Sequence, residues 1–443
     1  MSVQLPNDPA RDDVLAGRPA LWLNTALKAN GIADRSLPIR ASQVKEAEQN
    51  WKLLAPLLQI CFPELTESKG LIQSKLIEAT SLRKAVGYEA AEYGRVFVKA
   101  DGDLPVAGSI KARGGVYEVF MYAKQMAEKR GTLTPGGDIT VLASSQARAL
   151  FAQHTIAVGS TGNLGLSVGI AARALGFRAV VHMSSDAKQW KVERLTRLGV
   201  EVVQHKADYT TAVECARIDA EGDPTIYFVD DERSEMLFFG YSAAASELAS
   251  QLEAAGVTVD EEHPLFIYLP CGIGGAPGGA AYGLKAIFGD AAHAFFVEPV
   301  QSPCALVHMM SGSKELISVY DVGLTNRTEA DGMAVARMSA FVADVMKPML
   351  SGIFTVADDD LFRWLWMAET TQSIRLEPSA TAGFAGPEFI VKSPQGRAYQ
   401  EAQGLTGKLA QATHVIWTTG GAFVPEDQFK KFMDRGASLV NVD

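Results

Sequence analysis

The sequence predicts an α/β fold of mainly parallel, twisted sheets flanked by helices. After residue 90, short runs rich in Val, Ile, Phe and Tyr alternate with helix-like runs, and most of the β-like runs lack polar alternation. Strands covered on both faces have this composition, and their alternation with helices favours parallel βαβ units. The expected strands are Arg95–Ala100, Ile156–Gly159, Arg178–His182, Glu201–Gln204, Ile226–Val229, Leu265–Leu269, Ala294–Glu298 and His414–Trp417.

Helical periodicity justifies the elements between these strands. Residues 1–90 are expected to be helical and irregular, with apolar residues at helical spacing from Gln43 to Phe62. Residues 128–148, rich in turn-forming residues, are expected to form a surface excursion. The later expected helices are Leu164–Leu175, Lys188–Leu198, Thr210–Glu221, Ser242–Glu253, Gly279–Phe288, Asp358–Thr370 and Pro425–Arg435.

Composition excludes several classes of function. The net charge of -10, without a dense Lys/Arg run, argues against binding to nucleic acid or an anionic membrane. The four cysteines form no CxxC pair and the seven histidines no HxxxH pair, which argues against disulfide and zinc frameworks. The N-terminal residues lack the pattern of a secretory signal. We therefore expect a cytoplasmic protein, a monomer or small homo-oligomer, that acts on a small molecule.

The first of four turns that follow expected strands contains Lys111. Ser109 is expected to cap a helix there, which places Lys111 in the first helical turn. A cation is disfavoured at that end of the helix dipole, so an unmodified lysine is unusual there. A surface lysine is the more common outcome for any single lysine, and only the neighbouring motifs favour a functional one.

The second turn consists of Ser160, Thr161, Gly162, Asn163, Leu164 and Gly165, between a strand and a helix. Small residues at this point expose backbone N–H groups at a helix N-terminus, which suits a carboxylate or phosphate. An ordinary N-cap with a tight turn accounts equally well for this motif alone.

The third turn, residues 271–279, is the richest in glycine. Five of the eight residues from 272 to 279 are glycine, so the backbone can approach a ligand closely and form an anion-binding nest. Pro277 occupies the third glycine position of a GxGxxG fingerprint, and no Lys-Ser/Thr pair follows, so neither a dinucleotide loop nor a Walker loop is predicted. We expect the phosphate of a small cofactor. The fourth turn, Thr418–Gly421, has little specificity alone.

Taken together, five stretches resemble a known family: GSIKARGG, AVGSTGNLGLS, PCGIGGAPGG, RLEPSA and TTGGAFVPE. They are similar to motifs of the fold-type II pyridoxal-phosphate enzymes, the tryptophan synthase β family, and most closely to the bacterial D-serine dehydratases, over nearly the whole chain. The resemblance implies two domains. Residues 1–120 and 240–443 would form a large cofactor domain, and residues 121–239 a small domain.

The resemblance also implies roles for single residues. Lys111 would hold pyridoxal 5'-phosphate as a Schiff base, Asn163 would bond the ring hydroxyl, and Thr419 would face the pyridine nitrogen. Residues 160–164 would bind the substrate carboxylate. The phosphate would be held by Gly272, Ile273, Gly274, Gly275, Gly278 and Gly279.

A monovalent cation such as K+ is implied at Glu298, with Cys304 nearby. A buried carboxylate paired with a helix is an equally good interpretation of Glu298.

The implied reaction is β-elimination of D-serine, and also of D-threonine, to a 2-oxo acid and ammonia. A threonine opposite the pyridine nitrogen does not enforce its protonation, which suits a lyase better than an aminotransferase. Lys111 or a group on the opposite face would take the Cα proton of a D-substrate, and Asp231 and Tyr209 are the candidates for the second group. The acidic run 230–232 is also consistent with a solvated turn for at least two of its members. The alternatives are an L-serine/L-threonine dehydratase or a β-replacing synthase of the same fold, and, less favoured, a non-catalytic pyridoxal-phosphate-binding protein.

Overall fold

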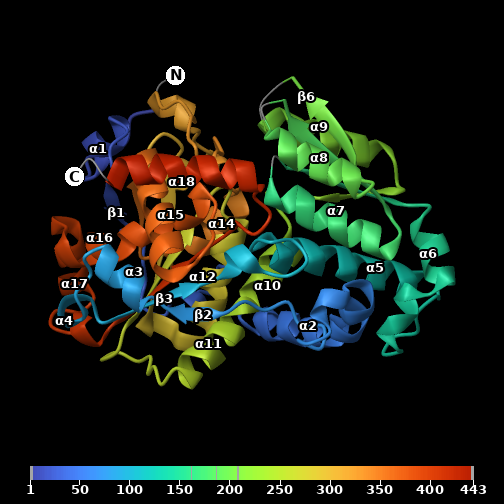
Figure 1. Cartoon of the computed structure of the whole chain (residues 1–443), viewed down its shortest axis with the longest axis horizontal. Coiled ribbons are helices and arrows are strands. Elements are labelled where there is room, and N and C mark those ends of the chain that lie inside the picture. Colours follow the sequence, from blue (N-terminus) through green and yellow to red (C-terminus); the bar gives the residue numbers. More distant parts are fainter. Residues whose placement is uncertain (1–2, 161, 186, 207–208, 441–443) are drawn as a thin grey trace. The chain divides into compact units, whose positions relative to one another are not determined.

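The computed structural model describes residues 3–160, 162–185, 187–206 and 209–440, without the side chains of residues 184 and 209–212 (Figure 1). The chain divides into two compact units, each of which is described by itself. The larger contains residues 1–41, 74–103 and 244–443, and the smaller contains residues 42–73 and 104–243. The division therefore differs from the predicted one, because residues 42–73 and 104–120, including Lys111, belong to the smaller unit.

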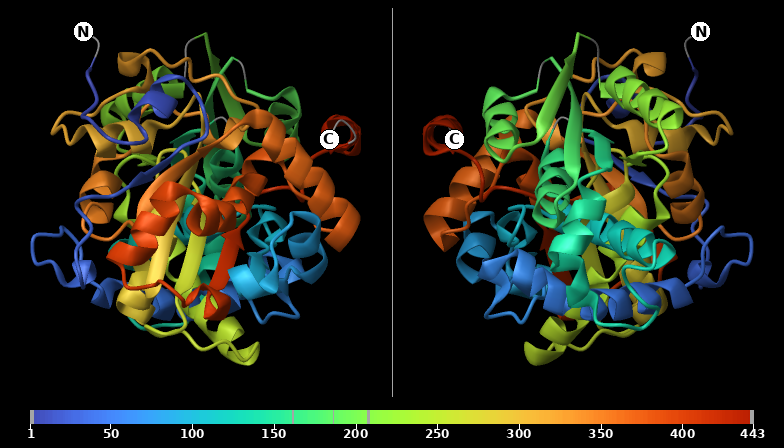
Figure 2. Two further views of the ribbon diagram at one scale, coloured as in Figure 1. Left: turned by 90° about the vertical axis from the view of Figure 1, so that its left-hand side faces the viewer. Right: turned by 90° about the vertical axis from the view of Figure 1, so that its right-hand side faces the viewer.

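The larger unit is built on a seven-stranded sheet in the order β1-β10-β9-β8-β11-β3-β2. The five inner strands are parallel, and the edge strands β1 and β2 are antiparallel to their neighbours. In Figure 2, β8, β9 and β11 run side by side. The strands are β1 Leu21–Leu23, β2 Leu76–Glu78, β3 Arg95–Lys99, β8 Leu265–Pro270, β9 Ala292–Pro299, β10 Gly352–Val356 and β11 Thr413–Trp417.

Apolar side chains from this sheet form the core of the larger unit. Phe266, Tyr268, Phe295 and Phe354 are fully buried and pack with the 3-10 turn Pro378–Ala385. Each such side chain contributes on the order of 2 kcal/mol by leaving water. The helices are α1 Arg11–Leu15, α3 Thr80–Ala85, α4 Ala90–Tyr93, α11 Ala244–Ala254, α12 Gly275–Phe288, α13 Cys304–Ser311, α14 Ala340–Met346, α15 Asp358–Gln372, α16 Gly386–Lys392, α17 Pro394–Ala402 and α18 Glu426–Val440.

The smaller unit has a four-stranded, fully parallel sheet in the order β6-β5-β4-β7. Because β4 and β7 are parallel neighbours, the segments that follow them, residues 160–165 and 230–232, leave the same edge of the sheet. The elements are α2 Ser42–Cys61, α5 Tyr117–Lys129, α6 Ser145–Phe151, β4 Thr155–Gly159, α7 Asn163–Leu175, β5 Arg178–Ser184, α8 Gln189–Arg197, β6 Glu201–His205, α9 Tyr209–Gly222, β7 Ile226–Val229 and α10 Glu235–Ser242.

The predicted strands all correspond to observed strands, with ends that differ by at most two residues. The short strands β1, β2 and β10 were not predicted, and α12 begins at Gly275 rather than at Gly279. Residues 128–148 are not a mere excursion, because Ile139, Leu142 and Ala147 are buried within the smaller unit. None of the described helices combines the length and apolar character that crossing a membrane requires.

Candidate active site

Lys111 begins the helical segment of the smaller unit that leads into α5. Its backbone is helical (φ -65°, ψ -18°), and a π-helical turn, Ala112–Val116, follows directly. Ser167 of α7 donates its hydroxyl to the Lys111 carbonyl at 2.8 Å. The Lys111 ammonium lies 5.6 Å from the ring centre of Tyr241 of α10. The lysine is thus half-buried on a tightly held backbone, and π turns of this kind are frequent at functional sites.

The two glycines after Lys111 are required by close packing. A Cβ on Gly114 would lie 2.3 Å from Cζ of Tyr241, and a Cβ on Gly115 would lie 2.5 Å from Oγ of Ser167. Both distances are far below van der Waals contact. The GG pair therefore lets α7 and α10 approach the lysine segment closely, rather than forming a loop for phosphate.

Ser109 does not cap this helix through its side chain, contrary to the prediction. Its carbonyl accepts the Ala112 N–H at 3.0 Å, while its hydroxyl is buried and has no hydrogen-bond partner among the described residues. An unsatisfied buried hydroxyl costs about 1–3 kcal/mol. A polar atom of a ligand near Lys111 would remove that cost.

Asp231, after β7, is half-buried and lies close enough to Lys111 for their charges to interact. Burial raises the pKa of Asp231, the positive charge of Lys111 partly lowers it, and the neighbouring Asp230 and Glu232 raise it further. Oδ1 of Asp231 is buried without a hydrogen-bond partner among the described residues. A carboxylate oxygen kept free in this way can exchange a proton with a ligand.

The two acidic neighbours of Asp231 have a structural role. Arg217 of α9 donates to both oxygens of Asp230 at 3.0 and 3.1 Å and to Glu232 at 2.7 Å. Asp230 and Glu232 are therefore partly buried ion-pair partners rather than purely solvated residues. The second predicted proton carrier, Tyr209, begins α9, but its side chain lies outside the described residues.

The Ser160–Leu164 turn connects β4 to α7, as predicted. Oγ of Ser160 accepts the N–H of Gly162 at 3.1 Å and that of Gly165 at 3.0 Å. Asn163 is half-buried at the first position of α7, whereas the Leu164 side chain is buried in the core and can offer a ligand only its backbone. Thr161 lies outside the described residues.

In the larger unit, the glycine-rich turn leads from β8 directly into α12. Gly274 precedes the helix with φ 110°, a conformation that favours glycine. Pro277 has no N–H, and the Gly278 N–H bonds to the Gly274 carbonyl at 2.8 Å. Gly275 and Ala276 therefore supply the first-turn N–H groups available to an anion. Gly278 and Gly279 lie within the helix, so only residues 272–274 form the turn itself.

The remaining predicted phosphate residues line this turn. Gly272 is closely packed, because a Cβ would lie 3.2 Å from the Gly332 carbonyl oxygen, a tight contact. Ile273 is buried, and its carbonyl accepts the Ser339 N–H at 2.8 Å. These contacts hold the turn in one conformation ahead of α12.

Thr419 is half-buried after β11, and its neighbour Thr418 fixes the turn. The Thr418 hydroxyl donates to the Lys99 carbonyl at 2.9 Å and accepts the Gly102 N–H at 3.3 Å. The Gly102 carbonyl in turn accepts the Ala422 N–H at 3.0 Å. The turn that carries Thr419 is therefore tied to the end of β3.

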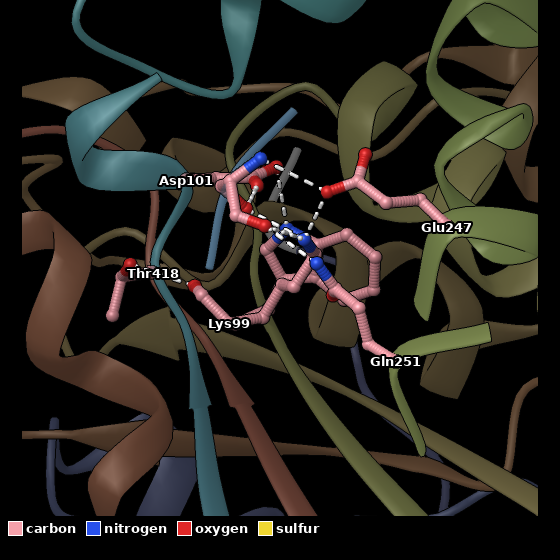
Figure 3. A network of polar contacts seen from close by, with 7 residues as sticks. Lys99, Asp101, Glu247, Gln251 and Thr418 are labelled. Atoms are coloured by element: carbon pink, nitrogen blue, oxygen red, sulfur yellow. Dashed lines mark hydrogen bonds and ion pairs between the residues drawn. The ribbon is translucent and has the colours of Figure 1, made fainter. Parts of the chain in front are cut away.

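Beneath this turn lies a buried polar network that the sequence analysis missed (Figure 3). The Lys99 ammonium donates to the carbonyl and hydroxyl oxygens of Ser74 and to Glu247 of α11. Asp101 accepts the Ser74 hydroxyl at 2.6 Å and the Trp417 indole N–H at 2.8 Å. A lysine inside an apolar strand run is the one sequence signal that could have revealed the network.

Glu298 is fully buried at the end of β9 and caps α13. Its two oxygens accept the N–H groups of Ala305 and Leu306 at 2.8 and 2.9 Å. Burial raises the pKa of Glu298 to about 8, although both bonds lower it. Cys304 is buried and its Sγ lies 3.4 Å from the Gly272 carbonyl oxygen. The described residues contain no group of three or more His, Cys, Asp or Glu side chains placed to hold a metal ion.

Comparison with known proteins identifies the family to which the sequence is similar. A family model described as pyridoxal-phosphate dependent enzyme matches residues 73–398. The chain is 66% identical to the "Probable D-serine dehydratase" of Rhizobium etli (strain CIAT 652), over 99% of this chain and 98% of the relative. It is 49% identical to the protein of the same name from Pseudomonas aeruginosa (strain PAO1), over 98% and 97% of the two chains.

Solved structures show the same fold. Diaminopropionate ammonia lyase from Escherichia coli in complex with D-serine matches with a TM-score of 0.70 and 18% identity, over 99% of this chain and 98% of that one. The processed form of threonine deaminase isoform 2 from Solanum lycopersicum matches with a TM-score of 0.63 and 18% identity, over 98% and 99%. The likeness confirms the predicted α/β fold with parallel-rich sheets.

Proposed function

This chain belongs to the pyridoxal-phosphate dependent enzymes, and from that premise we propose that it eliminates water from D-serine and that hydrolysis of the product then releases ammonia and gives pyruvate. The observation that carries the chemistry is the free, buried oxygen of Asp231 near Lys111 in the smaller unit. The choice of substrate is supported by the chain-long similarity to proteins named for D-serine.

Predicted site residues of each unit, taken separately, carry groups that suit pyridoxal phosphate. We propose that Lys111 bonds to its aldehyde carbon and that Asn163 bonds to its ring hydroxyl. The first turn of α12 would hold the phosphate through the N–H groups of Gly275 and Ala276, and Thr419 would face the ring nitrogen. The buried Ser109 hydroxyl supports the presence of a polar ligand beside Lys111. When bound, the cofactor supplies an electron sink for negative charge at the substrate Cα.

Asp231 is the proposed carrier of the Cα proton. In a D-amino acid the hydrogen and the side chain exchange places relative to an L-amino acid, so a group other than Lys111 can face the hydrogen. The raised pKa of Asp231 makes its carboxylate a stronger base than an ordinary one. Tyr209 is the alternative carrier. The β-hydroxyl leaves as water once protonated, and a water molecule then completes hydrolysis to pyruvate and ammonia.

We also propose that D-threonine is a second substrate and that K+ binds near Glu298. D-Threonine differs by one methyl group, and release of 2-oxobutyrate would test it. The buried carboxylate of Glu298 supports the cation, because a positive charge nearby would offset the desolvation that raises its pKa to about 8. Activity that is equal in K+ and in tetramethylammonium buffers would refute the proposal that K+ binds near Glu298.

The test of the function is pyruvate release from the purified holoenzyme with D-serine and, separately, with L-serine. Pyruvate from D-serine alone supports the proposal. Pyruvate from L-serine alone would show that the protein is instead an L-serine/L-threonine dehydratase. Absence of pyruvate from both, with a product that depends on added sulfide, would favour a β-replacing synthase.

A further inference from the structure

Lys191 is a buried cation that the proposed reaction does not yet use. It lies in α8 of the smaller unit, with an exposed fraction of 1%. A Cβ built on Gly162 would stand 3.2 Å from Nζ of Lys191. The ammonium also lies 5.3 Å from the ring centre of Trp190. A buried ammonium group therefore faces the backbone of the turn between β4 and α7.

That turn needs a source of positive charge if it is to bind a carboxylate. Oγ of Ser160, a neutral acceptor, already takes the N–H groups of Gly162 and Gly165. Two N–H groups at this helix N-terminus are thus engaged inside the protein. What remains is the partial charge of the α7 N-terminus, which is weaker than a full ammonium charge.

We propose that Lys191 binds the α-carboxylate of the amino acid substrate at Gly162, so that it is a specificity-determining residue; this rests on the proposed function. A Lys ammonium is a compact point charge with three donors, and its bond to a carboxylate strengthens away from water. Because Gly162 has no side chain, no Cβ lies between the backbone of the turn and Nζ of Lys191. The turn therefore selects substrates with a free carboxylate rather than an amide.

The decisive experiment compares a carboxylate with its amide. In the holoenzyme, calorimetry measures the Kd of D-alanine, which lacks a leaving group, and of D-alaninamide. Lys191→Met should weaken D-alanine binding roughly tenfold to hundredfold, the range expected for a hydrogen bond to a charged group, and leave the amide unchanged. Lys191→Arg should recover part of the loss. Lys285→Met, which removes another buried lysine in α12, should change neither Kd.

Gly162→Ala provides an independent variant that keeps the ammonium. Its methyl group would occupy the carboxylate space and should also weaken D-alanine binding more than amide binding. Equal losses for acid and amide, or no loss for either in both variants, would overturn the proposal. Because binding is measured without turnover, this result stands apart from the pyruvate test. If D-alanine binding alone is weakened but D-serine yields no pyruvate, the role of Lys191 in carboxylate binding would stand and the proposed dehydratase activity would be rejected.

Discussion

Replacement of Lys99 by methionine tests whether the buried network of the larger unit holds the site. Met keeps the length of the side chain but removes the ammonium, which donates to Ser74 at 2.9 and 2.6 Å and to Glu247. The two side chains of the ion pair are 0% and 9% exposed, so water cannot replace the lost bonds. Removing one partner of a buried ion pair costs about 3–5 kcal/mol, because the other charge stays buried.

The double variant Lys99→Met/Glu247→Leu separates this effect from simple loss of packing. Replacing both charges with apolar groups is often neutral, so we expect the double variant to lie within about 2 kcal/mol of the wild type. If Glu247→Leu alone also costs about 3–5 kcal/mol, the two single losses add to at least about 6 kcal/mol. The coupling free energy should therefore be at least about 4 kcal/mol in magnitude, above the usual range for residues in contact.

Urea unfolding of the holoenzyme, followed by circular dichroism, measures these free energies. The kcat with D-serine should fall in Lys99→Met, because the turn that carries Thr419 is held by the end of β3. A loss of less than about 1 kcal/mol in the single variant, or a double variant that loses the sum of both singles, would refute the reasoning.

Three further predictions concern the smaller unit. Gly114→Ala should cost about 1–3 kcal/mol, because its Cβ would lie 2.3 Å from a Tyr241 ring carbon, whereas Gly222→Ala enters open space and should be neutral in thermal unfolding. Burial raises the pKa of Glu118 from 4.5 to about 7, so the native state keeps a proton that the unfolded state has lost, and stability should fall as pH rises from 4.5 to about 7. In Glu118→Gln the midpoint of urea unfolding should no longer fall with pH between 4.5 and about 7. An unchanged pH dependence would exclude Glu118 as its source. Asp231→Asn should lower kcat by roughly 10²–10⁴-fold while cofactor absorbance is retained, and near-normal turnover would assign the proton to another group.

The strands and the glycine turns were predictable from local sequence alone. The runs beginning at Arg95, Leu265 and Thr413 are apolar and bounded by turn residues, and each forms a buried parallel strand. Strands β1 and β2 have only three residues each, too few for a periodic pattern. The start of α12 was misplaced because glycine and proline disfavour a helix interior, yet the whole first turn is buried and packed.

The site was predictable only where a role depends on residues close in sequence. The position of Lys111 at a helix start is such a case. Lys99 and Glu247 form an ion pair although they are 148 residues apart in the sequence. Oδ1 of Asp231 is left without a partner because Arg217 bonds to the two neighbouring acids, Asp230 and Glu232. No spacing rule encodes such contacts. The compact units differ from the predicted domains for the same reason, since α2 packs with elements that follow it at a distance in the chain.

The central claim is that Lys111 is the lysine that carries the cofactor. Borohydride reduction of the holoenzyme fixes the cofactor covalently to that amine, and peptide mass spectrometry then locates it. The account predicts a single phosphopyridoxyl group on the peptide that contains Lys111, and none in Lys111→Ala. A label on Lys99, Lys191 or Lys285, which are buried lysines among the described residues, would contradict the account.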